Sequence, residues 1–201
     1  MASPLLIAAL CMGKRHTGAF LFCLAGMGMC LLSAYLNTFL AALYGADAFA
    51  ATVEIAPVVE EGMKLLPLLF YLLVFEPQAR QIGIAAVITA LSFATFENIC
   101  YLIQNGAAHF SFIFFRGIGT GAMHVICGAI VGGGLAYVWR RTWLKIAGTC
   151  GLLGAAITFH AIYNLLIAYG GTAQYIAYLL PVGILAAGKL IFLFFLKKFD
   201  F

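Results

Sequence analysis

The chain has 201 residues, of which 65% are hydrophobic and 9% are charged. Such a composition lies outside the range of soluble domains, so it excludes a soluble enzyme and any separate soluble module. The net charge of +4 is explained by the placement of basic residues described below and does not indicate nucleic-acid binding. The sequence therefore predicts one domain over residues 1–201, an all-α, polytopic membrane protein whose partners include the lipid bilayer.

Apolar runs follow one another along the chain at the length that a bilayer requires. A spanning helix needs about 20 mostly apolar residues. Six runs satisfy this condition, and they cover 17–44, 50–75, 81–104, 112–138, 144–168 and 174–196. Residues 3–13 are also apolar but too short to span, and positive charges follow this run, whereas they would precede it in a secretory signal. We expect six transmembrane helices and a short or re-entrant N-terminal helix.

The links between these runs alternate in charge. Lys and Arg in or beside the links fall at Lys14, Arg15, Arg80, Arg140, Arg141, Lys145, Lys197 and Lys198. The links at 45–47, 105–109 and 170–174 contain neither Lys nor Arg. Because short basic links stay in the cytoplasm, we expect the segment at Lys14 and the C-terminus to be cytoplasmic in a multi-pass protein of the cell membrane.

Small and special residues indicate how the helices pack. Glycines spaced so that another backbone can approach closely are Gly117, Gly121, Gly128, Gly132, Gly151 and Gly154. The six cysteines form no C-x-x-C pair, so we expect buried structural thiols rather than disulfides or a zinc knuckle. Pro57 and Pro67 are expected to kink the second helix.

Polar and ionisable residues lie inside the predicted spans, where a charge costs about 2.5–3.5 kcal/mol and therefore marks a functional site. They come from the second to the fifth run: Glu60, Glu61, Lys64, Glu97, Asn98, Arg116, His124, His160 and Asn164. At about 1.5 Å per residue, the acids and histidines lie about 7–12 residues from the non-cytoplasmic ends of their helices. This agreement in depth predicts that they meet in one cavity. Arg116 is interpreted as an anchor that reaches the outer interface.

Spacing within the helices adds detail to this cavity. Residues at i and i+4 share a helix face, which places Glu60 with Lys64 and His160 with Asn164. Glu60 and Glu61 point about 100° apart, so they are expected to have different roles. Lys64 is interpreted as the charge partner of one of these two glutamates.

Carboxylates and imidazoles in one cavity are the groups that activate water, with a Glu as general base and a His as acid or polarising group. They are also ligands for a zinc-like ion, for which two His and one Glu with an open water position form a catalytic set. Other hydrolytic mechanisms lack their residues. The aspartates, Asp47 and Asp200, lie in a link and at the C-terminus, no serine lies in a G-x-S-x-G context, and no H-E-x-x-H occurs. A glutamate and histidine site for hydrolysis remains.

A proton- or cation-coupled transporter is the alternative hypothesis, because chains of Glu and His also form relays. Such a transporter is expected to contain an inverted repeat with broken helices, and no convincing repeat relates the two halves of this chain. A third hypothesis is a catalytically silent scaffold, against which the intact polar set argues.

Four motifs carry a specific resemblance to a known family. They are Glu60-Glu61-Gly62-Met63-Lys64, Phe93-Ala94-Thr95-Phe96-Glu97-Asn98, Arg116 leading to His124 with Gly128 and Gly132 beyond, and His160-Ala161-Ile162-Tyr163-Asn164. In residue type, order and helix placement the chain resembles the PrsW family of intramembrane proteases, distant relatives of the CAAX prenyl endopeptidases. The F-x-x-x-H element of the CAAX enzymes is here F-x-x-x-E, which favours the PrsW branch.

The resemblance implies an endopeptidase with a catalytic core at residues 50–168 that cleaves a membrane-anchored protein near the non-cytoplasmic face. An example is PrsW-like site-1 cleavage of an anti-sigma factor in a bacterial plasma membrane. By analogy with the CAAX relatives, Glu60 is the water-activating base, and His160 with Asn164 polarises the carbonyl and stabilises the oxyanion. Glu97 and His124 complete the water or metal site.

The candidate site consists of three sets of residues. The catalytic set is Glu60, Glu61, Glu97, His124, His160 and Asn164. The candidate ligands of a divalent metal such as zinc are Glu61, Glu97, His124 and His160. The supporting set is Lys64, Asn98 and Arg116. The residues leave open whether Glu60 or Glu61 is the base and whether a metal takes part.

Overall fold

The computed structural model describes residues 14–106 and 110–198, and every regular element in these ranges is helical. The elements are α2 (Lys14–Tyr44), α3 (Ala48–Ala50), the π-helical turn η1 (Ala51–Ile55), α4 (Ala56–Phe75), α5 (Ala79–Asn105), α6 (Phe110–Val138), the 3₁₀ turn η2 (Thr142–Leu144), α7 (Lys145–Tyr169) and α8 (Gly171–Lys198). The prediction of an all-α protein is confirmed. The predicted N-terminal helix at residues 3–13 lies outside the described residues.

Five helices are long and apolar enough to cross a membrane. They cover Thr17–Tyr44, Ala79–Gln104, Ile113–Val138, Thr142–Tyr169 and Gly171–Leu190. The remaining long helix, α4, has 20 residues and carries Glu60, Glu61 and Lys64, all of which are buried. The chain therefore has five to six long apolar helices able to span a membrane, in agreement with the predicted polytopic fold.

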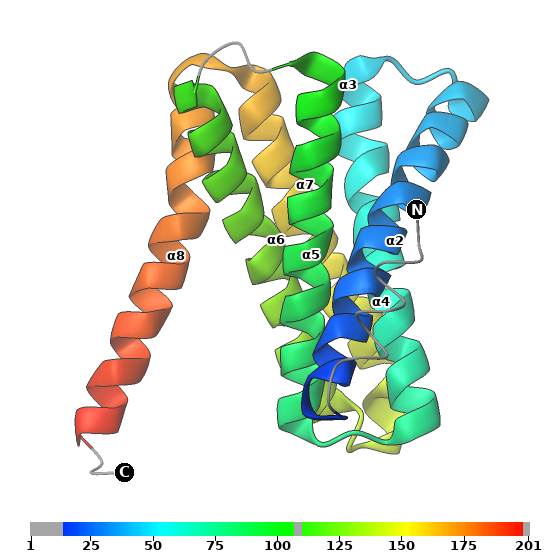
Figure 1. Cartoon of the computed structure of the whole chain (residues 1–201), viewed down its shortest axis with the longest axis vertical. Coiled ribbons are helices and arrows are strands. Elements are labelled where there is room, and N and C mark those ends of the chain that lie inside the picture. The colour runs from blue at the N-terminus through cyan, green and yellow to red at the C-terminus, as the bar shows by residue number, and fades with distance from the viewer. Residues whose placement is uncertain (1–13, 107–109, 199–201) are drawn as a thin grey trace.

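The long helices pack side by side into one bundle (Figure 1). Helix α5 packs against α2 and α6, α6 also packs against α7 and α8, and α4 packs against α2, α5 and α7. The α2–α3 and α7–α8 links, which contain no Lys or Arg, lie at the upper end in Figure 1, and the α4–α5 and α6–α7 links, which contain or adjoin basic residues, lie at the lower end. The C-terminal half of α8 leans away from the other helices. The predicted alternation of links therefore corresponds to the two ends of the bundle.

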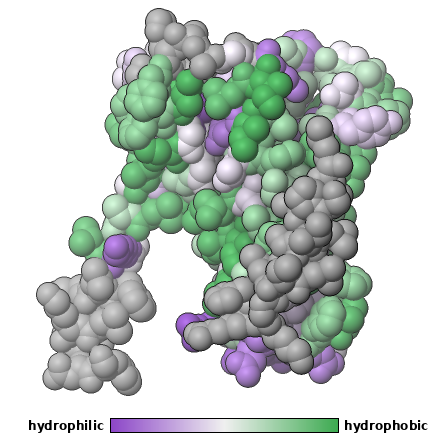
Figure 2. Space-filling view, viewed as in Figure 1, coloured by the Kyte–Doolittle hydropathy of each residue, from purple (hydrophilic) through white to green (hydrophobic). Residues whose placement is uncertain are grey.

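Most of the coloured surface in Figure 2 is hydrophobic, and hydrophilic residues are visible at both ends of the bundle. Inside the bundle, the buried face of α4 is polar in its first half and apolar in its second half. Glu61 and Lys64 are followed at helical spacing by the buried Leu68 and Leu72, which belong to the apolar core together with Met123 and other residues of α6. The polar cluster thus borders on a hydrophobic core that holds its helices together.

The predicted second span is helical throughout, but its backbone hydrogen-bond pattern changes just before the glutamates. The Asp47 Oδ1 accepts a hydrogen bond of 2.8 Å from the Ala50 backbone N–H and caps α3, and η1 follows. In this turn the Ala56 N–H donates to the Ala51 carbonyl, five residues back. The next donor in that pattern would be Pro57, which has no N–H. The kink expected at this proline is therefore a junction between a π-helical turn and an α-helix.

Glycines bring α6 close to α5. A Cβ added to Gly128 would lie 2.7 Å from the Ala90 Cβ, and one added to Gly132 would overlap the Ala86 Cβ. The predicted close approach is confirmed at these two positions. It is wrong for four others, because nothing described lies within 4 Å of a Cβ placed at Gly117, Gly121, Gly151 or Gly154.

We expect Gly132→Ala to lower the stability of the folded protein in detergent by about 1–3 kcal/mol, because the added methyl must push α5 and α6 apart. Thermal unfolding followed by circular dichroism measures this effect. The matched control is Gly133→Ala on the same helix, where an added Cβ meets nothing within 4 Å. Equal unfolding midpoints for the two variants would contradict the packing described for α5 and α6.

Candidate active site

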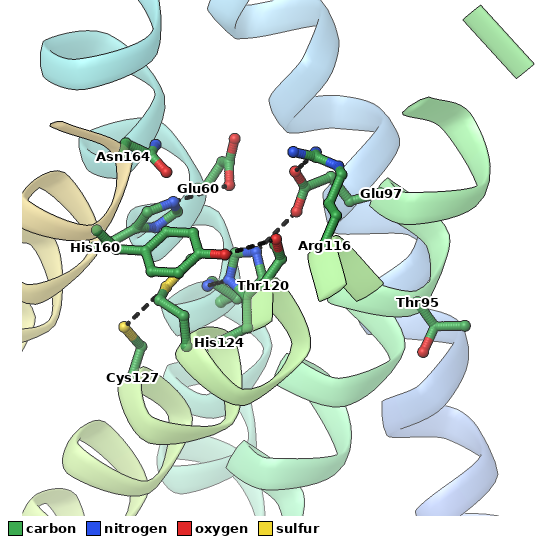
Figure 3. A network of polar contacts seen from close by, with 12 residues as sticks. Glu60, Thr95, Glu97, Arg116, Thr120, His124, Cys127, His160 and Asn164 are labelled. Carbon is green, nitrogen blue, oxygen red and sulfur yellow. Dashed lines mark hydrogen bonds and ion pairs between the residues drawn. The ribbon is translucent and has the colours of Figure 1, made fainter. Parts of the chain in front are cut away.

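The polar residues that the sequence predicted to meet do lie together in the bundle (Figure 3). They come from α4, α5, α6 and α7, and most of their side chains are buried. His124 has no exposed surface, and the exposed fractions of His160, Glu61 and Lys64 are 2%, 3% and 5%. Ionisable groups buried to this extent require partners, and these partners define the site.

An ion pair between Glu61 and Lys64 forms the inner part of the cluster. The Lys64 Nζ lies 2.6 Å from the Glu61 Oε1 and 4.9 Å from the centre of the Phe93 ring. The predicted charge partner of Lys64 is thus Glu61 at i−3, and not Glu60 at i−4. Because the pair is buried, removing one member would leave an uncompensated charge.

His124 connects this ion pair to Glu97. The Lys64 Nζ lies 2.7 Å from the His124 Nδ1, and the His124 Nε2 lies 2.8 Å from the Glu97 Oε2. An ammonium group can only donate, so Nδ1 accepts and the proton of the neutral imidazole is on Nε2, which donates to Glu97. Both ring nitrogens of His124 therefore have partners.

Arg116 forms the second charge pair of the site. Its Nη2 lies 3.3 Å from the Glu97 Oε1, and its guanidinium carbon lies 3.7 Å from the centre of the Tyr101 ring. The side chain of Arg116 is 18% exposed. Arg116 is therefore paired with Glu97 and stacked on an aromatic ring, and its interpretation as an anchor at the outer interface stays a prediction.

His160 is oriented by Glu61. Its Nδ1 lies 2.7 Å from the Glu61 Oε1, so the imidazole donates its Nδ1 proton to this carboxylate. The Nε2 atom then carries a free lone pair, and it lies 3.8 Å from the Glu60 Oε2. A histidine whose far nitrogen is held by a carboxylate is typical of metal sites and of catalytic sites, because the free nitrogen is fixed in direction and tautomer.

Glu60 differs from the other two glutamates because no described cation pairs with it. Its Oε1 accepts a hydrogen bond of 3.2 Å from the Asn37 Nδ2 of α2. Its Oε2 is buried and has no hydrogen-bond partner among the described residues. Glu61 and Glu97 are each matched by a cation, which leaves Glu60 as the carboxylate with an oxygen available for chemistry.

A cavity of about 590 Å³ gives access to part of the cluster. Of the predicted site residues, it is lined by Glu60, Glu97, Arg116, His160 and Asn164. The remaining walls come mainly from α2, η1 and the C-terminal half of α5. Glu61, Lys64 and His124 do not line the cavity and lie behind the residues that do. The cluster therefore has an accessible layer and a supporting layer.

The family model of the PrsW family intramembrane metalloproteases matches residues 14–188 of the chain. This chain belongs to the PrsW family. No curated protein and no solved structure matches it significantly. The family consists of intramembrane proteases, and the clustered glutamates and histidines of this PrsW-family protein agree with that activity.

The family name implies a metal, and the donor atoms of this PrsW-family protein fit one. Among the described residues, Glu60, His124 and His160 offer ligand atoms that all lie within 4.8 Å of one another. Two His and one Glu are a known zinc-binding set. The orphaned Glu60 Oε2 is directly available, and so is the Nε2 lone pair of a neutral His160, whereas the His124 Nε2 would have to give up both its proton and its hydrogen bond to Glu97. This set contains Glu60 in place of the predicted ligands Glu61 and Glu97.

Asn37, which contacts Glu60 from α2, was missed by sequence reasoning. At the cavity wall, the Thr120 hydroxyl lies 3.0 Å from the Tyr163 hydroxyl. A polar amide inside an apolar span was the available signal for Asn37, but its partner cannot be read from the sequence. The predicted supporting residue Asn98 does not line the cavity, and its Oδ1 is buried without a partner among the described residues.

Asn164 lines the cavity one turn from His160, on the same face of α7, as predicted. Its Nδ2 donates a hydrogen bond of 2.9 Å to the Thr52 carbonyl of η1. In the five-residue pattern of this turn, that carbonyl would be paired with the N–H of residue 57, which is a proline. Asn164 therefore satisfies a backbone group that Pro57 leaves free, and its second amide hydrogen remains for a ligand.

Proposed function

We propose that this protein is an endopeptidase that hydrolyses a peptide bond of a membrane-anchored protein near the non-cytoplasmic face of the membrane. One observation carries the proposal: the buried Glu60 Oε2 has neither a cation nor a hydrogen-bond donor among the described residues and lies 3.8 Å from the His160 Nε2 at the edge of a cavity. A carboxylate oxygen and an imidazole lone pair in this arrangement can bind and activate one water molecule.

In the proposed reaction, the Glu60 Oε2 accepts a proton from water while the water oxygen attacks the carbonyl carbon of the scissile bond. The same proton then passes to the amine nitrogen as the C–N bond breaks, so one water is consumed and Glu60 returns to its carboxylate form. The resemblance to the CAAX enzymes implied that His160 acts on the substrate carbonyl. We propose instead that the neutral form of His160, oriented by Glu61, directs the water through its Nε2 lone pair, while the free amide hydrogen of Asn164 stabilises the oxyanion.

With a divalent metal such as zinc, Glu60, His124 and His160 would be the ligands, and the Glu60 Oε2 and the His160 Nε2 would then hold the ion instead of contacting the water directly. When bound, such an ion would supply Lewis acidity and lower the pKa of a bound water. Behind these residues, the Glu61 carboxylate holds the orientation of the His160 ring, and Lys64 holds that of the His124 ring. Glu97 and Arg116 contribute a paired charge at the cavity wall.

The proposed substrate is a single-span protein such as an anti-sigma factor in a bacterial plasma membrane. Two features support cleavage on the non-cytoplasmic side. The cavity is lined by residues close to the link at residues 45–47, which contains no Lys or Arg, and the basic links lie at the opposite end of the bundle. A membrane-anchored chain could reach the Glu60 carboxylate from that side without crossing the core.

The test is cleavage of a panel of single-span anti-sigma factors by the protein in proteoliposomes, with and without a chelator, with the metal content measured on the same sample. We expect cleavage that the chelator reduces and that added zinc restores. Full cleavage by metal-free protein would assign water activation to Glu60 without an ion. Absence of cleavage together with a Glu97-dependent proton flux would favour a transporter instead.

A further inference from the structure

Helix α2 contributes none of the family-like motifs, yet one of its side chains reaches the proposed base. The Asn37 Nδ2 donates a hydrogen bond of 3.2 Å to the Glu60 Oε1, 23 positions away in the sequence. We propose that Asn37 is a positioning residue that turns the Glu60 carboxylate so that its Oε2 faces His160 and the cavity. This inference rests on the proposed role of Glu60.

The hydrogen bond from Asn37 fixes the orientation of the Glu60 carboxylate. The terminal torsion of a glutamate side chain is broad, so an unheld carboxylate turns and exchanges its two oxygens. The distance of 3.8 Å between the Glu60 Oε2 and the His160 Nε2 is too long for a hydrogen bond. Asn37 therefore provides the hydrogen bond that fixes one Glu60 oxygen and leaves the other free.

Asn37 is a neutral partner of Glu60, whereas the other two glutamates of the site have cationic partners. Lys64 pairs with Glu61, and Arg116 pairs with Glu97. A cation on Glu60 would hold its geometry equally well but would weaken it as a base, because an adjacent positive charge stabilises a carboxylate against proton uptake. A neutral amide donates one hydrogen bond without adding charge. An Asn at position 37 thus suits a carboxylate that must be both oriented and reactive.

Close packing fixes the position of α2, the helix that carries Asn37. Gly26 of α2 lies so close to α5 that an added Cβ would overlap the Ser92 Oγ and the Thr89 carbonyl. Helix α2 also contacts η1 and α4, the helix that carries Glu60. Asn37 is therefore presented from a helix packed on three elements of the site. The family match begins at residue 14 and includes α2, whereas the catalytic core predicted from the motifs began at residue 50.

The test compares the kinetics of Asn37→Ala and Asn37→Asp with those of the wild type on one single-span substrate in proteoliposomes. A hydrogen bond to a charged group corresponds to about a 10–100-fold change in rate. We expect Asn37→Ala to lower kcat by this factor with KM unchanged, since Asn37 contacts Glu60 and acts through it. Asn37→Asp should lower kcat further, because it removes the donor and places a second carboxylate beside Glu60.

Two further variants separate positioning from packing. Ser33→Ala changes a buried residue on the same face of α2, one turn away, whose Oγ has no partner among the described residues, and it should leave kcat unchanged. Asn37→Gln restores an amide donor and should recover part of the lost kcat. Equal losses in Asn37→Ala and Ser33→Ala, or wild-type kcat in Asn37→Ala while Glu60→Gln is inactive, would overturn the positioning role. Full activity of Glu60→Gln would instead overturn the proposed function.

Discussion

Glu60→Gln is expected to lower the rate of substrate cleavage by about 10²–10⁴-fold, which is the range that a positioned general base contributes. Glutamine has nearly the same shape and keeps an oxygen that can accept from Asn37, so the fold should persist. It loses the lone pairs on the second terminal atom, which in the wild type is the partner-free Oε2. A single-turnover assay on a single-span substrate in proteoliposomes measures the effect, and His160→Ala should give a comparable loss.

The matched control for this prediction is Glu54→Gln in η1. Glu54 is an exposed glutamate only six positions earlier in the chain, and it does not line the cavity. Its cleavage rate should equal that of the wild type. If Glu60→Gln cleaves as fast as Glu54→Gln, Glu60 is neither the base nor a required ligand, and the proposed chemistry fails.

Lys64→Met is expected to destabilise the folded protein by about 3–5 kcal/mol, because it leaves the buried Glu61 carboxylate without its cation. Methionine fills a similar volume, so the loss reports on charge rather than on a cavity. The variant also removes the donor to the His124 Nδ1, which frees the orientation of that imidazole. The free energy of unfolding in detergent, measured by chemical denaturation, gives the effect.

Two comparisons test the origin of that loss. Lys189→Met removes an exposed lysine of α8 and should leave the unfolding free energy unchanged. The double variant Glu61→Gln with Lys64→Met removes both charges and should recover much of the stability, since neutralising a buried pair as a whole is far less costly than breaking it. Equal stability of Lys64→Met and the wild type would show that the ion pair contributes nothing.

Much of the fold followed from the sequence because hydrophobic length is a strong signal in a membrane protein. The predicted runs at 17–44 and 81–104 correspond to the helices Lys14–Tyr44 and Ala79–Asn105. The structure of the second run, at 50–75, was harder to predict. The change from π-helix to α-helix depends on which backbone carbonyls are satisfied by neighbouring helices. Pro57 gave the position of this change, but the contact from Asn164 to Thr52 arises 112 positions away in the chain.

The composition of the site also followed from the sequence, whereas its pairings did not. Helical spacing allows Lys64 to reach residues at both i−3 and i−4, and the choice of Glu61 depends on His124 and His160 packing on the same side. The depth of Arg116 was consistent with an interface anchor, and only the neighbouring α5 makes it a partner of Glu97. Such choices are made by tertiary contacts that periodicity does not encode.

Glycine spacing gave a similar partial result. The pattern identified positions where helices can approach, but it does not say which face of a helix meets a neighbour. Gly128 and Gly132 face the small side chains of α5, whereas Gly117 and Gly121 face open space among the described residues. The missing information is the rotation of α6 about its axis, which the whole bundle sets.

The most direct test of the central claim is intact-mass analysis of the products formed from a single-span substrate in proteoliposomes. Hydrolysis at the proposed site predicts two fragments whose masses sum to the substrate plus one water, with the cut near the non-cytoplasmic end of the span. The fragments should be absent with Glu60→Gln and present with Glu54→Gln. An unchanged substrate mass with the wild-type protein, or a cut within the cytoplasmic half of the span, would contradict the proposed function.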